Sequence, residues 1–144
     1  MKILALDIAT KTGWKTEHAS GVRNFKLKRG ESSGMLLIHF RKFIDEMVKT
    51  CEITLICYER AGGRHAASIA FQSEMIGILK AYCEEHGLNL TAYSAKEIKK
   101  HATDNGNAGK PLMIKKAIEL GFNPTDDNEA DAIHLYRLAV ESLT

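Results

Sequence analysis

Two runs of apolar residues predict buried strands, and each run ends on a carboxylate. Residues 2–8 and 53–59 are almost continuously apolar, as expected for strands covered on both faces of a sheet. Asp7 lies at the end of the first run, and Glu59 ends the second. An ionised carboxylate is costly at the end of a buried strand unless it has a partner. These two acids are therefore the first candidates for function.

The rest of the pattern alternates between strand-like and helical periods. Lys11 to Gly13 reads as a turn, and Gly21 as the hairpin between the second and third strands. Ser94 and Glu97 form a capping box at the start of a short helix. The expected strands are 2–8, 12–18, 21–28, 53–59 and 88–93, and the expected helices are 33–49, 66–86, 94–101, 111–120 and 127–143. This order predicts one α/β domain over 1–144, with an antiparallel three-strand meander plus parallel strands, flanked by helices.

The topology predicts that the two strand-end acids meet. A right-handed crossover through helix 33–49 makes strand 53–59 parallel to the first strand. Asp7 and Glu59 then face one crevice outside the carboxyl ends of the strands, where α/β sheets bind ligands. Asp131, near the start of the last helix, can reach the same edge.

Crowded carboxylates repel one another unless a cation intervenes, and oxygen ligands select hard ions such as Mg²⁺ or Mn²⁺. The implied chemistry is phosphodiester hydrolysis with two ions about 3.5–4 Å apart, one activating water and one stabilising the leaving oxygen. Asn128 and Asp127 lie three and four residues before Asp131, so either can share its helical face.

Each acid also has a purely structural explanation. Asp7 alone would hydrogen-bond the backbone of a turn at Thr10–Gly13. Asp126 or Asp127 would simply favour a helix N-terminus. Taken together, with both strands ending at the same edge, the acids favour a functional site.

Composition limits the classes of protein to consider. With 44% hydrophobic and 26% charged residues, the chain has a soluble globular profile, and no apolar run approaches the roughly 18 residues of a membrane span. The first seven residues are too short and too soon acidic for a signal peptide, so we expect cytoplasmic residence. Three cysteines without C-x-x-C and six histidines without H-x-x-x-H give no support to a zinc or redox site.

The net charge of +2 does not by itself indicate nucleic acid, but the charges are unevenly distributed. Acidic residues of 126–131 follow a lysine-rich segment made of Lys96, Lys99, Lys100, Lys110, Lys115 and Lys116. A basic rim beside an acidic pocket suits a polyanion held over metal ions. On charge alone, a solvated helix face is the better explanation.

The motifs in order resemble those of the RuvC-type Holliday junction resolvases, which have a ribonuclease H-like fold. The similar segments are ILALDIATKTGW at 3–14, ICYE at 56–59, SAKEIKK at 94–100, NGNAGK at 105–110 and NEADA at 128–132. The last motif is closest to that of phage-encoded members. The resemblance covers nearly the whole chain.

The resemblance implies a Mg²⁺-dependent crossover junction endodeoxyribonuclease, with Mn²⁺ able to substitute and no organic cofactor. It would act as a homodimer that cuts opposed strands of a four-way or branched DNA junction, in a bacterial or phage-infected cell, with helix 66–86 at the dimer contact or simply in the core. The implied catalytic residues are Asp7, Glu59, Asp131 and Lys110. The implied metal ligands are Asp7, Glu59, Asn128 and Asp131. The implied DNA-binding residues are Lys11, Arg60, Lys99, Lys100, Asn105, Asn107 and Lys110.

Two positions depart from the family pattern. Ala9 stands where the family usually has glycine, which would limit how closely the first turn approaches DNA. Asn128 replaces a second acid of the last helix. Its amide oxygen can still bind a hard cation, without charge, and Asp127 is the alternative fourth ligand.

Other functions stay open at this point. A nuclease of the same fold acting on RNA–DNA hybrid or on generic branched DNA has the same motifs. The segment from Asp7 to Gly13 also resembles the phosphate-binding hairpin of actin and sugar kinases, although those proteins enclose a nucleotide between two such lobes. A catalytically silent DNA-binding module is disfavoured by the intact acids.

Overall fold

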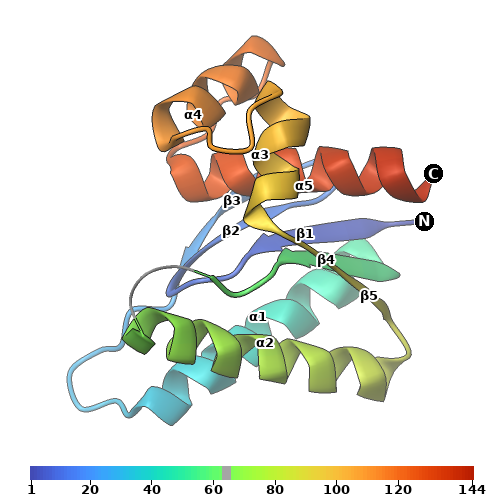
Figure 1. The fold of residues 1–144 in the computed structure, drawn as a ribbon. Helices are drawn as coiled ribbons and strands as arrows, with labels where there is room; N and C mark the ends of the chain where they lie inside the picture. Colours follow the sequence, from blue (N-terminus) through green and yellow to red (C-terminus); the bar gives the residue numbers. More distant parts are fainter. Residues whose placement is uncertain (63–65) are drawn as a thin grey trace.

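A five-stranded mixed sheet organises the chain in the computed structural model, which describes residues 1–62 and 66–144 (Figure 1). The strand order is β3-β2-β1-β4-β5. β1 and β3 are both antiparallel to β2, while β4 runs parallel to β1 and to β5. The strands are β1 (Ile3–Asp7), β2 (Lys11–Lys15), β3 (Ser20–Asn24), β4 (Leu55–Glu59) and β5 (Asn89–Tyr93). The predicted meander with parallel strands beside it is confirmed.

Helices cover both faces of this sheet (Figure 1). α1 (Ser33–Cys51) and α2 (Ala66–His86) lie on one face. α5 (Asp127–Leu143) crosses the other face, and α3 (Ala95–Thr103) and α4 (Lys110–Glu119) stack on α5. α2 and α5 both begin at the edge of the sheet where β1 ends, so this edge collects several element ends.

Alternation along β1 divides its side chains between two cores. Leu4 and Leu6 belong to the cluster that contains Phe40 of α1 and Leu79 of α2. Ile3 and Ala5 belong to a second cluster with Leu135 and Ala139 of α5. The strand therefore reads as a continuous apolar run because both of its faces are covered by helices.

The predicted turns of the meander were wrong in two places. Lys11 to Gly13 is not a turn, because these residues form the start of β2. The hairpin turn lies over 16–19, where the amide N–H of Thr16 donates to the Ala19 carbonyl at 2.8 Å. Gly21 lies within β3, opposite Trp14, and a Cβ there would stand 3.0 Å from the indole ring. This glycine serves close packing rather than chain reversal.

The helix boundaries follow local sequence signals. Ser94 and Glu97 form the predicted capping box at the start of α3, with the Ser94 hydroxyl accepting from the Glu97 amide. Gly87 ends α2 with φ at 65°, the left-handed conformation expected at the C′ position. Across the two described ranges, no helix combines the length and the apolar character needed to cross a bilayer.

Candidate active site at the carboxyl ends of β1 and β4

Strand alternation places Asp7 and Glu59 on the same face of the sheet. Asp7 follows Ala5 by two residues, and Glu59 follows Cys57 by two, so both acids face the layer of α5. The parallel register pairs Leu6 with Tyr58, and one further step sets Asp7 beside Glu59. Neighbouring strands are about 4.8 Å apart, so the two carboxylates share one site as predicted.

The start of α5 brings the third acid, Asp131, to this edge. α5 lies directly against β2, and the contact depends on Gly13, because a Cβ there would stand 1.9 Å from the backbone oxygen of Asn128. Only glycine lets the helix backbone approach the strand so closely. Asp131 is then close enough to Asp7 for its charge to raise the pKa of Asp7.

Burial raises the pKa of all three acids, and repulsion by neighbouring acids adds to the rise for Asp7 and Asp131. Asp7 is 9% exposed, and its pKa is raised well above the ordinary value, first by burial and then by the charges of Asp131 and Glu59. Burial, with the charges of Glu59 and Asp127, raises the pKa of Asp131 to about 7. Burial also raises the pKa of Glu59. Such shifts are typical of carboxylates held together with too little positive charge beside them.

No described residue satisfies these acids. Within 1–62 and 66–144, the side chains of Asp7, Glu59 and Asp131 take part in no ion pair and accept no hydrogen bond. Carboxylates that are buried or half-buried without a partner are costly to ionise, and a hard divalent cation with oxygen ligands would satisfy them. The donor set therefore fits Mg²⁺ or Mn²⁺. As the side chains stand, however, no three Asp, Glu, His or Cys residues of the described part converge closely enough to hold one ion, so binding requires rotation of these side chains.

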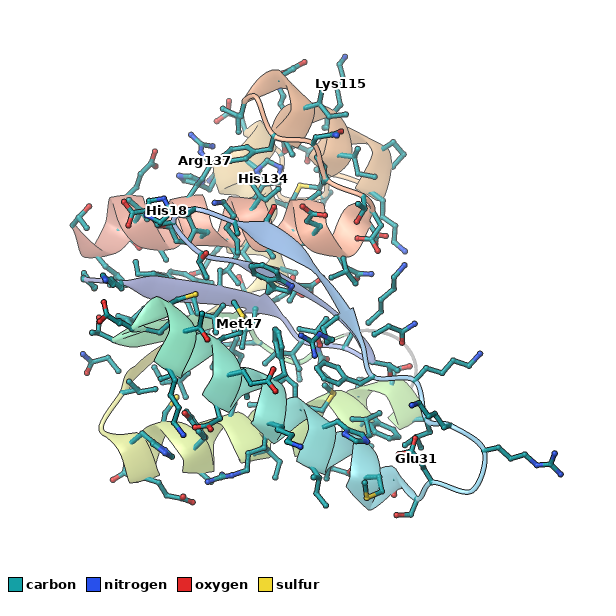
Figure 2. All side chains as sticks on the ribbon, turned by 180° about the vertical axis from the view of Figure 1, so that it is seen from behind. His18, Glu31, Met47, Lys115, His134 and Arg137 are labelled. Atoms are coloured by element: carbon teal, nitrogen blue, oxygen red, sulfur yellow. The ribbon has the colours of Figure 1, made fainter. Side chains whose placement is uncertain are left out.

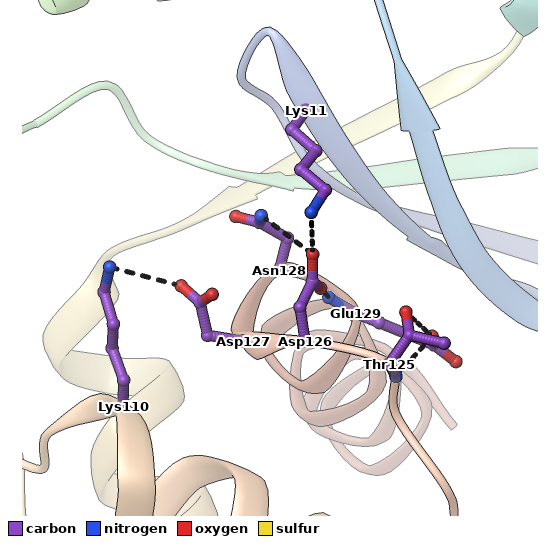
Figure 3. A network of polar contacts seen from close by, with 7 residues as sticks. All are labelled: Lys11, Lys110, Thr125, Asp126, Asp127, Asn128 and Glu129. Atoms are coloured by element: carbon purple, nitrogen blue, oxygen red, sulfur yellow. Dashed lines mark hydrogen bonds and ion pairs between the residues drawn. The ribbon is translucent and has the colours of Figure 1, made fainter.

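The first turn of α5 carries further acids, and two of them are paired (Figure 3). Lys11 Nζ lies 2.9 Å from Asp126 Oδ2, and Lys110 Nζ lies 3.5 Å from Asp127 Oδ2. Asp126 is also the helix cap, because its Oδ1 accepts from the amide of Glu129 at 2.9 Å. The structural explanation of Asp126 is thus correct. Lys11 and Lys110, two of the four lysines predicted to bind DNA, thus flank the site but are engaged with its acids.

Asn128 and Asp127 point to different surroundings. Asn128 Nδ2 lies 3.4 Å from Asp126 Oδ2, and Asn128 lines a groove of about 550 Å³ beside Ala9 and Lys11. Asp127 turns towards Lys110 in Figure 3, yet its charge raises the pKa of both Asp7 and Asp131. Either residue remains a candidate fourth ligand.

Asp7 does not shape the turn that follows it. That structural role belongs to Thr12, whose hydroxyl donates to the Ala9 carbonyl at 2.5 Å. The carboxylate of Asp7 is therefore left for the site.

The other residues predicted to bind DNA are spread around the site. Lys99 is near the acids, since its charge opposes the rise in the pKa of Glu59 and of Asp131. Arg60 lies 3.7 Å from Glu97, and Lys100 is exposed on α3. Asn105 shapes the loop between α3 and α4, with its Oδ1 accepting from the amide of Asn107 at 2.9 Å. Asn107 is exposed.

Two polar residues support the site without having been predicted. Gln72 of α2 donates to the Ile8 carbonyl at 3.0 Å and accepts from the Gly62 amide at 3.3 Å, which joins the ends of β1 and β4. Glu129 is buried, and accepts from Ser20 Oγ at 2.6 Å and Thr125 Oγ1 at 2.9 Å. The four-residue spacing between Thr125 and Glu129 could have indicated the role of Glu129, because it allows the two side chains to meet. Nothing in the sequence pointed to Gln72.

Comparisons with known proteins identify relatives in fold and sequence. No family model matches the chain. The crossover junction endodeoxyribonuclease RuvC of Corynebacterium glutamicum is 28% identical over 103 residues, which cover 69% of this chain and 47% of that protein. The match thus spans less than half of the relative's length.

Three solved structures of RuvC and of a related Holliday junction resolvase superpose on most of the chain. RuvC of Thermus thermophilus has a TM-score of 0.77 with 17% identity, covering 100% of this chain and 98% of its own. T. thermophilus RuvC in complex with a Holliday junction substrate gives 0.76 with 16% identity, covering 94% and 90%. The yeast mitochondrial resolvase Ydc2 gives 0.66 with 14% identity, covering 92% and 75%.

These comparisons confirm the predicted fold and the resemblance to RuvC-type Holliday junction resolvases. The mixed five-stranded sheet with flanking helices is the ribonuclease H-like fold of RuvC. The phage-like subtype stays a prediction.

Proposed function

We propose that this protein is a divalent-metal-dependent endodeoxyribonuclease that resolves four-way or branched DNA junctions. The observation that carries the proposal is the set of three acids, the buried Asp7 and the half-buried Glu59 and Asp131, which share one sheet edge and have no hydrogen-bond or ion-pair partner among the described residues. The likeness in fold and sequence to junction resolvases supports DNA as the substrate.

Asp7, Glu59 and Asp131 would hold Mg²⁺, or Mn²⁺ in its place, with Asn128 or Asp127 completing the set. Two bound ions would activate water and stabilise the leaving oxygen of a phosphodiester. Burial keeps bulk water from screening the acids, so they hold a cation strongly once it displaces their protons. Deprotonation is required for metal binding, and with the pKa of Asp131 at about 7, metal binding strengthens as the pH rises through neutrality.

Basic residues around the acids would position the scissile strand. Lys99 and Lys110 stand close enough to Asp131 for their charges to counter the rise in its pKa. Lys11 and Lys110 are each paired with an acid of the first turn of α5. Phosphate groups would compete for these ammonium groups, so we assign both lysines to backbone contacts at the site, and Lys110 to a catalytic role there.

Paired cutting of a junction needs two such sites. This chain supplies one set of acids, so we propose a homodimer in which each copy cuts one of two opposed strands. Hydrolysis of a single strand in RNA–DNA hybrid would need only one copy. The oligomeric state therefore separates the resolvase proposal from the hybrid-cleaving alternative.

The experiment is to incubate the protein with labelled four-way junction, branched three-way DNA, linear duplex and RNA–DNA hybrid, each with Mg²⁺, with Mn²⁺ and with chelator. We expect metal-dependent, symmetric cuts in opposed strands of the junction and no cutting of linear duplex. Cutting of hybrid in preference to junction would replace the proposal with the hybrid-cleaving alternative. Cutting that persists in chelator would show that the reaction does not depend on a divalent metal ion.

A further inference from the structure

We propose that a second basic surface, formed by Arg23, Lys26, Lys28, Arg29 and Lys42, binds the phosphate backbone of a duplex arm leaving the cut site. The inference rests on the proposed function and names how the flanking DNA is held. This surface lies on the β3–α1 side of the sheet, away from the lysines of α3 and α4.

The basic surface begins next to the catalytic edge. Asn24, the last residue of β3, pairs with Lys11 at the start of β2. The next amide, that of Phe25, donates to the Thr10 carbonyl at 2.8 Å. Thr10 lies three residues after Asp7, so a duplex bound at the carboxylates passes this segment as it leaves.

The cations of this surface outnumber the acids beside them and form no close ion pair in the described part of the chain. Within the described residues, none of its five cations forms an ion pair, in contrast to Lys11 and Lys110. The acids beside them are Glu31 and Glu46. Glu31 accepts from the amide of Lys28 at 2.7 Å and lies 3.1 Å from His39 Nε2, so it is engaged with other groups. Cations kept together in this way repel one another and attract a polyanion.

A rigid support holds the surface in place. Phe25 is 5% exposed and packs edge-on against the rings of Phe40 and Phe43, with centroids 5.6 and 5.7 Å away. The guanidinium of Arg23 lies over the Phe43 ring at 4.9 Å. These contacts anchor the loop on α1. Figure 2 shows Glu31 where the loop returns to the helix, with nitrogen-tipped side chains extending outward from the loop.

The shape also suits a phosphate backbone. A groove of about 230 Å³ runs between the end of β3 and α1, with Arg23, Lys26, Lys28 and Lys42 around it. Glu31 and Glu46 also line this groove, but a small groove in which cations predominate suits a charged backbone better than an apolar ligand. The carboxylates thus lie between two basic regions, this one and that of α3 and α4, and a duplex crossing the site contacts both.

The test compares Lys28→Ala/Arg29→Ala with Lys2→Ala/Lys49→Ala, a pair that removes the same charge at the opposite end of the sheet. Lys2 and Lys49 form ion pairs with Glu52 and Asp45, far from the site. Binding of long-armed and short-armed four-way junctions is measured without divalent ions over a range of salt concentrations. The salt slope is the change in the logarithm of the binding constant with the logarithm of the salt concentration. Its magnitude falls by about 0.9 for each lysine or arginine that no longer contacts a phosphate. We therefore expect the Lys28/Arg29 variant to show a slope smaller by up to about two units on long arms only.

Several outcomes overturn the inference. An unchanged slope and affinity for the Lys28/Arg29 variant, or equal losses of affinity for both variants, would show that the surface does not contact DNA. Losses equal on long and short arms would place the contact at the cut site rather than along an arm. Binding of anionic lipid vesicles that depends on Lys28 and Arg29, with junction binding unaltered, would assign the surface to membranes instead. A different result would contradict the proposed function itself: an Asp131→Asn variant that cuts junctions as fast as the unmodified protein.

Discussion

The two ends of the sheet treat acidic residues in opposite ways. At the amino end of β1, Lys2 Nζ lies 2.6 Å from Glu52 Oε2, and at the nearby end of α1, Lys49 lies 2.8 Å from Asp45. These hydrogen-bonded ion pairs lower the pKa of Glu52 and of Asp45. At the carboxyl end, Asp7 has no such partner in the described part of the chain, and burial with neighbouring acids raises its pKa.

The difference shows that acids whose ionisation is unfavourable are concentrated at the carboxyl end of the sheet. Exposed, paired acids at the amino end cost nothing to ionise, and their pairs are worth little because water screens them. The unpaired acids at the carboxyl end, one buried and two half-buried, oppose folding at neutral pH, since their charged forms are poorly solvated. Such an arrangement persists at functional sites, where a ligand supplies the missing charge.

The largest expected effect comes from neutralising a single acid at the carboxyl end of the sheet. Asp7→Asn, Glu59→Gln or Asp131→Asn should each lower junction cutting on the order of 1,000-fold, because several kcal/mol of metal-dependent stabilisation is lost. Junction binding without metal should change little. Single-turnover cutting and gel-shift assays measure the two quantities.

Glu52→Gln is the matched control for these variants, because it neutralises an acid at the amino end. It should cut at the rate of the unmodified protein. If Glu52→Gln lost as much activity as Glu59→Gln, the contrast between the two ends would have no functional meaning.

A second test changes the geometry of the carboxyl end without changing any charge. The Cβ of Gly13→Ala would stand 1.9 Å from the Asn128 backbone oxygen, so α5 must move away from β2. We expect a loss of about 3 kcal/mol in unfolding free energy, the upper range for overpacking, together with loss of cutting as Asp131 separates from Asp7. Thermal unfolding and single-turnover cutting report the two effects.

Gly77→Ala is the control for that substitution. An added Cβ at position 77 meets nothing within 4 Å, so alanine in this α2 position should be neutral or stabilise by up to about 1 kcal/mol. A Gly13→Ala protein with unaltered stability would show that α5 does not depend on close contact with β2.

A third test uses the titration of Asp131. Its pKa is about 7 in the folded protein against 3.8 ordinarily, so between these values the folded state binds more protons than the unfolded state. Stability without divalent ions should therefore fall as the pH rises from about 4 to about 7, by on the order of 4 kcal/mol for this group. Asp131→Asn should reduce that fall, with the remainder due to Asp7 and Glu59, whose pKa values are also raised, and it should unfold at a higher temperature at pH 8.

Comparing the two proteins separates the contribution of Asp131, including its effect on the pKa of Asp7, from that of the other titrating groups. The buried His134, labelled in Figure 2, has a pKa lowered mainly by burial, so its contribution runs the other way and is lost as the pH falls. Mg²⁺ should stabilise the unmodified protein at pH 8 and have little effect on Asp131→Asn. Equal Mg²⁺ stabilisation of both would place the ion elsewhere.

Sequence reasoning placed the strand-end acids better than the turns, for physical reasons. Buried strands and crossover handedness follow general rules, so Asp7 and Glu59 could be placed at one edge. Gly13 and Gly21 were misread as turn residues, because a glycine needed for a close tertiary contact looks the same in sequence as one needed for a turn. The contact between Gln72 and Ile8 depends on how α2 docks, which no local pattern encodes.

The smallest expected effect concerns the fourth ligand. Asn128→Ala removes a neutral amide and should raise the Mg²⁺ concentration for half-maximal cutting by no more than about tenfold if that amide is a ligand. Asp127→Asn instead removes a charge that raises the pKa of Asp7 and Asp131, so those acids would ionise at lower pH. If Asp127 is the ligand, its variant needs more Mg²⁺ than Asn128→Ala does. If Asp127 acts only through its charge, its variant shifts the pH dependence of cutting to lower pH while the Mg²⁺ requirement at high pH stays unchanged. Titrating Mg²⁺ at two pH values distinguishes these outcomes, and an unchanged requirement in both variants would limit the site to the three acids.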